Sequence, residues 1–471
     1  MAESYDFVVI GAGSAGLTAA GFAAQLGARI ALLEKNRIGG DCTWTGCVPS
    51  KTLLKIARVA HQMRTADHHG LTPVNPTVDL KSVMSRVRNV IDQVYEHESP
   101  EALRADGVDV LLGNVRFIDP HTIAVDDNTV TARHVLLTTG AHSFIPPISG
   151  LDSVNYLTYE TIWKMEVLPA HLLIIGAGPI GCEMAQAFCR LGSKVTVIEG
   201  GERMLPRDEP TASKVMTDVF TSEGIDLRFN VTVEHAWQDT NGIHLIAGGQ
   251  KLVGDALLVA VGRRPNVDNL GLDKAGVVHS PRGIEVDDHL RTSQRHIYAA
   301  GDCTGSYQFT HYAGWQAAMA VRNALLPGAV KGVRESVPWT TFTDPEVAHV
   351  GLTEGQAREK YGDAVMTCDW SMERVDRARA ESDTAGFLKL IHKKDGTFLG
   401  ATIVSGRAGE MIHEWIVALE RGLKVGDLAQ IIHVYPTYST ASMQAAADIR
   451  VAQLLGGTSG RIIHRVAHLM R

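Results

Sequence analysis

The chain has no uninterrupted apolar run of about 18 residues, the length that a membrane-spanning helix requires. It also has no excess of positive charge, because 45 Lys and Arg stand against 52 Asp and Glu, for a formal net charge of -7. These absences argue against a membrane protein and against nucleic acid as the main partner. We interpret the basic stretch Arg461 to Arg471 as an amphipathic terminal helix rather than a binding patch.

The N-terminus has no basic region and no cleavage signal, and it enters a strand almost at once. We therefore expect a cytoplasmic location. Cysteine is scarce, with six in 471 residues, and only Cys42 and Cys47 are closely spaced. In a cytosolic protein such a pair more often indicates catalysis or metal binding than a structural disulfide. We interpret the other four as buried small hydrophobic residues: Cys182, Cys189, Cys303 and Cys368.

The length of 471 residues is too great for one hydrophobic core, so two to four domains are expected. The composition, 45% hydrophobic and 21% charged, is that of a globular protein.

The chain opens with a βαβ pattern. A strand over Tyr5 to Ile10 is followed by GAGSAG, an Ala-rich helix from Leu17 to Leu26, and a strand over Arg29 to Leu33 that ends at Glu34. Glycines in this pattern allow a tight turn and close approach to a pyrophosphate, which meets the free N–H groups of the helix. A carboxylate about 20 residues on can accept from a ribose hydroxyl.

The pattern occurs a second time. A strand over Leu172 to Ile175 precedes GAGPIG, a helix to about Leu191, and a strand over Lys194 to Ile198 that ends at Glu199. A single fingerprint is weak evidence, but two complete copies predict two dinucleotides, of which a flavin and a nicotinamide are the natural pair.

Between the fingerprints and after them lie further recognisable segments. A long helical segment is predicted over Lys81 to Asp106. The segment IYAAGDC ends a buried strand and places Asp302 where it can reach a ribityl or phosphate group. The C-terminal part has no glycine-rich phosphate loop and is predicted to contain two strands and two helices: Phe387 to His392, Phe398 to Val404, Gly409 to Arg421 and Ser439 to Leu455.

The segment GGDCTWTGCVPSK carries the chemistry. Two thiols in one short segment can form a disulfide or hold one soft metal ion. Pro49 marks a helix start. A thiol at a helix N-terminus has a lowered pKa, and the thiolate is its reactive form. Together with the fingerprints, this predicts a redox enzyme that passes electrons through a dithiol.

These motifs, in this order, resemble the class I pyridine nucleotide–disulfide oxidoreductases, a family that includes dihydrolipoamide dehydrogenase, glutathione reductase, soluble transhydrogenase and mercuric reductase. The resemblance implies an α/β fold of two Rossmann-type dinucleotide-binding domains plus a C-terminal α+β dimerisation domain. We expect an FAD-binding domain at 1–150 and 285–336, an NAD(P)H-binding domain at 151–284, and an interface domain at 337–471 that forms a homodimer.

The resemblance also implies roles for residues. Cys47 would face the flavin and Cys42 the acceptor, and Lys51 and Glu183 would form an ion pair near the flavin and nicotinamide. The expected cofactor-binding residues are Gly11, Gly13, Gly16, Glu34, Gly140, Gly301 and Asp302 for FAD, and Gly176, Gly178, Gly181 and Glu199 for the nicotinamide dinucleotide. Trp44 departs from the Asn that many relatives have there.

The acid/base dyad of the thiol-exchanging relatives is missing. Those relatives have HxHPTxSE near the C-terminus, whereas this chain has HVYPTYST at 433–440. Tyr435 stands in place of the His, and Thr440 in place of the Glu. A phenol titrates near 10 and an imidazole near 6.5, so Tyr435 is a poor proton shuttle. His433 lies two residues away, and we interpret it as structural rather than as a substitute base.

Mercuric reductase also has Tyr at this place, and its metal substrate releases no thiol that needs a proton. Soluble transhydrogenase has a Tyr-Pro-Thr run but lacks the second cysteine of the pair. The chain thus most resembles a mercuric reductase, with Tyr435 of the partner subunit lining the site and Cys42 and Cys47 holding the metal only transiently. It lacks the C-terminal cysteine pair and the N-terminal metal-binding domain of mercuric reductases.

Glu199 favours NADH over NADPH, because a carboxylate there accepts from the ribose 2′-OH and repels a 2′-phosphate. Arg203 complicates this, since it could meet such a phosphate. The acceptor remains open among a metal ion, a quinone and a small disulfide. The alternatives are a dihydrolipoamide dehydrogenase or related disulfide reductase, and a flavoprotein redox sensor with weak diaphorase activity.

Overall fold

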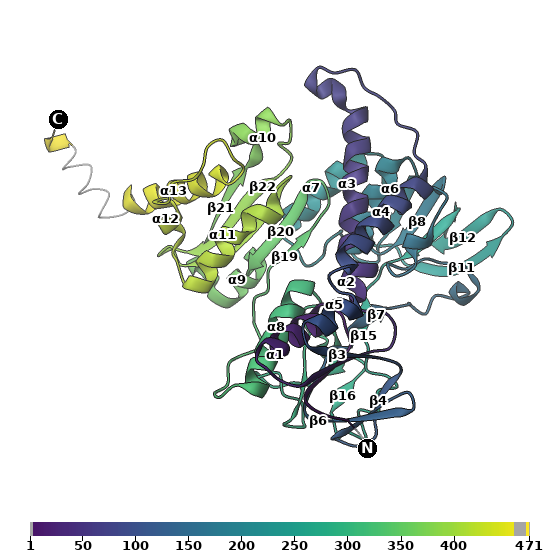
Figure 1. Cartoon of the computed structure of the whole chain (residues 1–471). Coiled ribbons are helices and arrows are strands. Elements are labelled where there is room, and N and C mark those ends of the chain that lie inside the picture. The colour runs from purple at the N-terminus through teal and green to yellow at the C-terminus, as the bar shows by residue number, and fades with distance from the viewer. Residues whose placement is uncertain (1–2, 456–467, 471) are drawn as a thin grey trace. The chain divides into compact units, whose positions relative to one another are not determined.

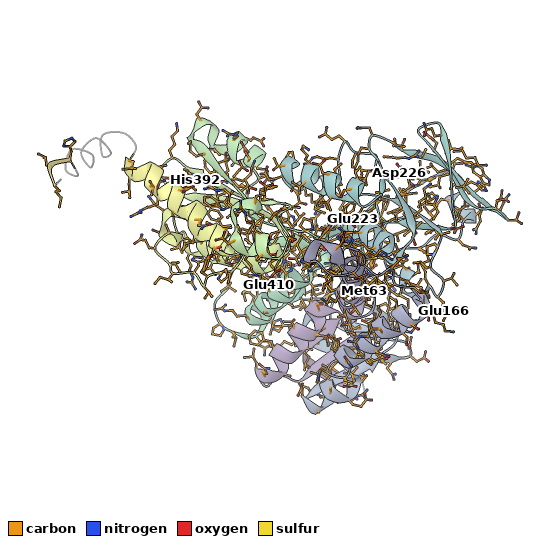
Figure 2. The ribbon with its side chains drawn as sticks, turned by 90° about the horizontal axis from the view of Figure 1, so that it is seen from above. Met63, Glu166, Glu223, Asp226, His392 and Glu410 are labelled. Carbon is orange, nitrogen blue, oxygen red and sulfur yellow. The ribbon has the colours of Figure 1, made fainter. Side chains whose placement is uncertain are left out.

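The computed structural model describes residues 3–455 and 468–470 (Figure 1). These residues fall into two compact units. The first unit comprises residues 3–56, 78–175 and 233–335, and the second 57–77, 176–232, 336–455 and 468–470. The helix predicted for Arg461 to Arg471 lies outside the described residues except for 468–470. No helix in the part of the chain that is described is both long and apolar enough to cross a bilayer.

The main sheet of the first unit has seven strands. Its order is β3 (Val108–Leu112), β2 (Ile30–Glu34), β1 (Glu3–Ile10), β6 (Asn128–Leu137), β5 (Thr122–Val125) and β4 (Val115–Phe117), and β18 (Ile297–Ala299) also pairs with β6. Neighbouring strands among β3, β2, β1, β6 and β18 pair in parallel. The pairs β6–β5 and β5–β4 are antiparallel. Parallel strands are covered on both faces, which explains the apolar runs in β1 and β2.

Helices α1 (Ser14–Gln25) and α8 (Thr310–Leu325) pack against each other beside this sheet (Figure 1). Four alanines of α1 are buried in this packing, and their small side chains let the helices approach closely: Ala15, Ala19, Ala20 and Ala23. The chain then forms α2 (Gly40–Trp44), α3 (Cys47–Arg64), α4 (Leu80–Tyr95) and α5 (Pro100–Ala105).

Smaller sheets complete the first unit. β7 (Ala141–Ser143) pairs with β15 (Arg263–Pro265), and β8 (His171–Ile175) pairs in parallel with β14 (Ala256–Val259). An antiparallel sheet contains β11 (Val233–Asp239), β12 (Gly242–Ala247) and β13 (Gln250–Gly254), and a short hairpin contains β16 (His279–Ser280) and β17 (Gly283–Ile284).

The second unit contains the second fingerprint and the C-terminal sheet. The former provides α6 (Pro179–Leu191), β9 (Lys194–Ile198), α7 (Pro210–Ser222) and β10 (Asp226–Arg228). The latter is antiparallel in the order β19 (Trp339–Thr341), β20 (Glu346–Gly351), β23 (Phe398–Ser405), β22 (Phe387–Lys393) and β21 (Val365–Ser371). Its helices are α9 (Glu354–Tyr361), α10 (Asp376–Ala380), α11 (Ala408–Arg421), α12 (Val425–Leu428) and α13 (Thr440–Leu455).

A hydrophobic core joins this sheet to its helices. α11 lies on β20 and β23, and α13 contacts β21 and β22 (Figure 1). The indole of Trp415 is fully buried there, and its Nε1 donates to Ser442 Oγ at 3.0 Å. The predicted α/β architecture with a C-terminal α+β region is confirmed.

One predicted element differs. The single helical segment expected over Lys81 to Asp106 is two helices, α4 and α5. Ser99 caps the second, because its Oγ accepts from Ala102 N at 3.2 Å, and Pro100 occupies the first turn. Proline disfavours helical geometry in the residue before it, so the break falls at this Ser-Pro step.

Candidate active site

The first fingerprint forms a glycine turn between β1 and α1. Gly11 has φ +105°, and a Cβ on Gly16 would overlap the carbonyl oxygen of Gly11. Glu34 closes the turn, since its Oε2 accepts from Ala12 N at 2.7 Å and its Oε1 from Asn36 N at 2.8 Å. The nearest atom to a Cβ on Gly13 would be 3.8 Å away, which leaves space above the N-terminus of α1.

The second fingerprint repeats this geometry. Gly176 also has φ +105°, and Glu199 Oε2 accepts from Ala177 N at 2.7 Å while its Oε1 accepts from Gly201 N at 2.8 Å. No atom would lie within 4 Å of a Cβ on Gly178. Gly181 is buried in the first turn of α6. The two turns are thus built alike, with an open backbone cradle at each helix N-terminus.

The cysteine segment lies directly against the first turn. Gly40 has φ +58°, and a Cβ on it would be 2.6 Å from the Cα of Gly13. Cys42 lies within α2, and Cys47 is the first residue of α3. The predicted helix start around Pro49 is confirmed, with Cys47 itself at the helix N-terminus.

The thiols of Cys42 and Cys47 are partly buried and interact with each other. Cys47 Sγ lies 3.3 Å from Thr310 Oγ1, at the N-terminus of α8. The hydrogen bond to Cys47 raises the pKa of Cys42 far above its ordinary value, and burial adds to this, while hydrogen bonds from Thr310 and Ser14 oppose it. Cys42 is therefore held protonated beside Cys47, which lies at two helix N-termini.

A partly buried polar network holds the start of α2. Arg263 donates to Asp302 Oδ2 at 2.7 Å, to the carboxylate of Asp41, and to Tyr159 Oη at 3.2 Å. Tyr159 Oη in turn donates to Asp41 Oδ2 at 2.9 Å. Burial raises the pKa of Asp302, and Arg263 opposes this rise. Burial likewise raises the pKa of Tyr159, so its hydroxyl stays protonated.

Two further predicted glycines flank this network. Gly140 has φ +71°, and its carbonyl accepts from Asn266 N at 2.9 Å. Gly301 has φ +79°, and its N–H donates to the buried Gln316 Oε1 at 2.9 Å. Gly140 thus lies in a turn just after β6, and Gly301 lies in a turn just after β18, directly before Asp302.

Lys51 and Glu183 belong to different units. Lys51 Nζ donates to Ser50 Oγ at 3.2 Å, and the buried Glu183 Oε1 accepts from Phe342 N at 3.0 Å. The predicted ion pair between them stays a prediction.

Trp44 is anchored by its own surroundings. Its Nε1 donates to the carbonyl of Ile38 at 2.6 Å, and its ring lies 5.0 Å from the ring of Tyr95. The guanidinium of Arg37 lies 4.1 Å from the indole centroid, in cation–π contact. These contacts give Trp44 a packing role beside the cysteines.

The C-terminal run places Tyr435 and His433 in separate hydrogen bonds. Tyr435 is 67% exposed, and its hydroxyl donates to Asp376 Oδ2 at 2.9 Å, which raises the pKa of this phenol. His433 Nε2 lies 2.8 Å from Glu414 Oε2, and its Nδ1 lies 3.0 Å from the carbonyl of Ile431. Burial lowers the pKa of His433, but the hydrogen bonds with Glu414 and the Ile431 carbonyl and the charge of Glu414 together outweigh it, so the net change in this pKa is a rise.

Comparison with known proteins agrees with this arrangement. Residues 5–317 match the pyridine nucleotide-disulphide oxidoreductases, and residues 337–446 match their dimerisation domain. The chain belongs to this family. It is 37% identical over 439 residues to a mercuric reductase of Bacillus cereus, covering 92% of this chain and 69% of the relative. It is 32% identical to a dihydrolipoyl dehydrogenase of Bacillus subtilis, covering 94% and 95%.

A solved structure is similar throughout. The Cu(II) complex of RclA, an HOCl-induced flavoprotein disulfide reductase of Escherichia coli, aligns with a TM-score of 0.85 and 30% identity over 93% of this chain and 98% of that one. The protein is thus an FAD-dependent pyridine nucleotide–disulfide oxidoreductase, and its family uses NAD(P)H as reductant.

The residues present fit two dinucleotides. The open space over Gly13 and over Gly178 lies where a helix N-terminus presents unpaired N–H groups, which is where a pyrophosphate binds. Among residues 3–455 and 468–470, no three His, Cys, Asp or Glu side chains are grouped as a resident metal site.

Sequence reasoning missed several residues around the thiols. Asp41 stands beside Cys42 in the motif, and Arg263 lies in the run GRRPN at 262–266, but no local pattern pairs them, because 222 residues separate them. Thr310 is 263 residues from Cys47 and has no motif of its own. These partners are visible only once β15 and α8 are placed in the fold.

Proposed function

We propose that this protein is an NADH-dependent flavoprotein that passes electrons through the Cys42–Cys47 pair to a thiophilic metal ion. The observation that carries this proposal is the retained dithiol combined with Tyr435 at the place of the acid/base histidine. Thiol–disulfide exchange with an organic disulfide needs a proton for its leaving thiol, whereas reduction of a metal ion does not.

The side chains near Tyr435 support this choice. Its hydroxyl already donates to Asp376, whose negative charge raises the pKa of the phenol, so Tyr435 is a poor proton shuttle near neutral pH. Both ring nitrogens of His433 are engaged, by Glu414 and by the carbonyl of Ile431. This supports the structural interpretation of His433.

The proposed chemistry balances at the two sulfurs. FAD, when bound, supplies two-electron transfer between the nicotinamide and the disulfide. Reduction breaks the S–S bond with two electrons and leaves a protonated Cys42 and a Cys47 thiolate. Cys42 releases its proton when an Hg(II) ion binds both sulfurs, because a soft cation favours thiolate ligands. The two thiolates then give two electrons to the metal and re-form the disulfide.

Relatives give this acceptor class further support. Mercuric reductases are among the curated relatives, and RclA has been solved as a Cu(II) complex. Both metals bind sulfur ligands well. We therefore propose Hg(II) or Cu(II) as the substrate class, with one Hg(II) reduced to Hg(0), or two Cu(II) reduced to Cu(I), for each disulfide that re-forms. We further propose that the domain boundaries, the site residues and the cytoplasmic location expected from the sequence hold for this protein.

NADH is the proposed reductant. Glu199 directly follows β9, where a carboxylate can meet a ribose hydroxyl. Arg203 does not face an open phosphate site: its guanidinium donates to the carbonyls of Leu205, Pro206 and Asp208 and to Ser213 Oγ. This engagement removes the sequence-based argument for a 2′-phosphate.

A disulfide reductase is the second candidate, favoured by the similarity to a dihydrolipoyl dehydrogenase. In that case His433, paired with Glu414, would have to leave the Ile431 carbonyl to act as a base. A flavoprotein redox sensor with weak diaphorase activity is the third candidate, and the experiment below distinguishes it from the other two.

The deciding experiment measures NADH oxidation by purified holoenzyme with Hg(II) plus excess thiol, with Cu(II), and with lipoamide, and repeats each with NADPH. We expect turnover with a metal ion, loss of this turnover in Cys42→Ser with flavin reduction by NADH intact, and at least about tenfold lower efficiency with NADPH. The matched control is Cys368→Ser, a partly buried thiol on β21.

Each contrary result has a defined meaning. Fast turnover with lipoamide that is lost in His433→Gln would establish the disulfide reductase. Slow turnover with every acceptor, together with a stable protein partner, would establish the sensor. Equal efficiency with NADPH would overturn the assignment of Glu199.

A further inference from the structure

The residues that directly precede the two cysteines are bonded to each other. The carbonyl of Asp41 accepts from Gly46 N at 2.5 Å and from Thr45 N at 2.9 Å. Asp41 precedes Cys42, and Gly46 precedes Cys47. The position of Asp41 therefore fixes the backbone from which the side chains of Cys42 and Cys47 extend. The packing is tight, because a Cβ on Gly46 would lie only 2.9 Å from the same carbonyl.

The side chain of Asp41 is fixed from outside the segment. Its carboxylate takes hydrogen bonds from Arg263 and from Tyr159, and Arg263 is itself held by Asp302. Side-chain exposure is 17% for Arg263, 14% for Asp302 and 39% for Asp41, so the guanidinium is largely shielded from water while the Asp41 carboxylate is partly exposed. A charge-assisted bond in such a site is stronger than one at the surface.

A second aromatic residue fixes the other end of the same turn. Trp163 Nε1 donates to the carbonyl of Thr45 at 2.9 Å and to that of Tyr159 at 2.7 Å. Tyr159 and Trp163 are both buried. The segment that contains them therefore holds both ends of α2, one through Asp41 and the other through Thr45.

We propose that Asp41, clamped by Arg263 and Tyr159, is a positioning residue that holds Cys42 within bonding reach of Cys47 and so favours the disulfide over the dithiol. This inference rests on the redox role proposed above for the cysteine pair. In this proposal Asp41 acts on the pair through the backbone of α2, because its carbonyl binds the N–H groups of Thr45 and Gly46.

The physical basis is effective concentration. Two thiols held at a fixed separation close a disulfide more readily than two on a loose turn, because the entropic cost of bringing them together is already met by the fold. Reduction by an external dithiol breaks the protein S–S bond, transfers two electrons and two protons to the cysteines, and oxidises the reagent to its cyclic disulfide. Loosening the clamp shifts this equilibrium towards the protein dithiol.

The test measures that equilibrium directly. Holoenzyme is equilibrated without oxygen in mixtures of reduced and oxidised dithiothreitol, quenched in acid, and alkylated so that mass spectrometry counts free thiols at Cys42 and Cys47. Asp41→Asn should shift the equilibrium about tenfold towards the dithiol, which for a two-electron couple is about 30 mV. Tyr159→Phe changes no charge and should shift it in the same direction by about threefold, since the hydroxyl's bonds to Asp41 and Arg263 are lost while the Arg263–Asp41 ion pair remains.

Glu98→Gln is the matched control. Glu98 Oε2 accepts from Thr43 Oγ1 at 2.7 Å, so this change also removes a carboxylate bonded to α2, but outside the clamp. Its equilibrium should stay within about twofold of wild type. The proposal is overturned if Asp41→Asn behaves like wild type, or if Glu98→Gln shifts the equilibrium as far as Asp41→Asn does.

The result is independent of the acceptor. No NADH, metal ion or lipoamide is present, so a failure of metal reduction would leave this equilibrium and its dependence on Asp41 unchanged. A wild-type protein that forms no Cys42–Cys47 disulfide under oxidising mixtures would overturn both proposals, and the thiol count identifies that case.

Discussion

Asp208 is a carboxylate whose burial makes the stability of the protein depend on pH. It is 3% exposed, and its Oδ1 accepts from Trp339 Nε1 at 2.8 Å. Burial raises its pKa to about 6, although Trp339 and nearby arginines oppose the rise. The unfolded chain has a value near 3.9. The folded state therefore binds this proton more tightly than the unfolded state does.

The sign of the effect follows from this difference. The stabilisation from Asp208 is fully present below about pH 4 and is lost as the pH rises through about 6, at 1.36 kcal/mol per pKa unit. Asp208→Asn keeps an oxygen acceptor for Trp339 and does not titrate. We expect its stability relative to wild type to be about 2 kcal/mol higher near pH 7.5 than near pH 4.5, measured by urea unfolding.

Asp218→Asn provides the control for that measurement. Asp218 lies on α7 and is bonded to Lys214 at 2.7 Å, but its side chain is 66% exposed. An exposed pair contributes little to stability, so its difference between the two pH values should be under about 1 kcal/mol. An equal dependence in both variants would show that the effect of Asp208 is a general charge effect.

At the scale of elements, α2 makes a close backbone contact with the turn before α1. Gly40 has φ +58°, a conformation that costs an L-residue about 1–2 kcal/mol, and its added Cβ would meet the backbone of Gly13. Gly40→Ala should therefore destabilise the protein by about 2 kcal/mol or more and weaken flavin retention. Flavin absorbance after gel filtration and urea midpoints measure the two effects.

For Gly21→Ala we expect the opposite effect on the stability of the protein, a gain. Gly21 lies inside α1, and no atom would lie within 4 Å of its Cβ. Alanine in an open helical site stabilises by about 0.5–1 kcal/mol. Similar losses from both substitutions would mean that the Gly40 contact has no special role.

The elements that the sequence predicts best are those with local signals. The strands and helices of both fingerprints lie within a few residues of their predicted positions, because glycine turns and apolar runs mark their ends. The break between α4 and α5 had a local signal too, in Ser99 and Pro100, but the apolar periodicity on either side concealed it.

The partners of the cysteines had no such signal. Arg263 reaches Asp41 only because β15 pairs with β7, and Thr310 reaches Cys47 only because α8 begins there. A contact between residues more than 200 positions apart depends on the whole path of the chain. The motif therefore identified the thiols, and only the fold identified the side chains that position them.

At the scale of the whole molecule, the C-terminal region leaves apolar side chains in water. Ile432 is 96% exposed and Val434 76%, next to Tyr435 at 67%. All three lie within the residues that match the dimerisation domain. A contiguous apolar patch of this kind marks an interface. We expect a second copy of the chain to cover it.

Ile432→Glu tests this expectation, because a carboxylate buried against an apolar partner surface is costly without a partner charge. We expect the variant to sediment at the mass of one chain where the wild type sediments at twice that mass. Because Tyr435 would then lack a facing subunit, turnover with the acceptor should fall while flavin reduction by NADH persists. Val167→Glu, at a valine 78% exposed outside the patch, should leave both the mass and the turnover unchanged. A dimer that survives Ile432→Glu would place the interface on another surface, and it would also remove the reason for assigning Tyr435 to the partner's site.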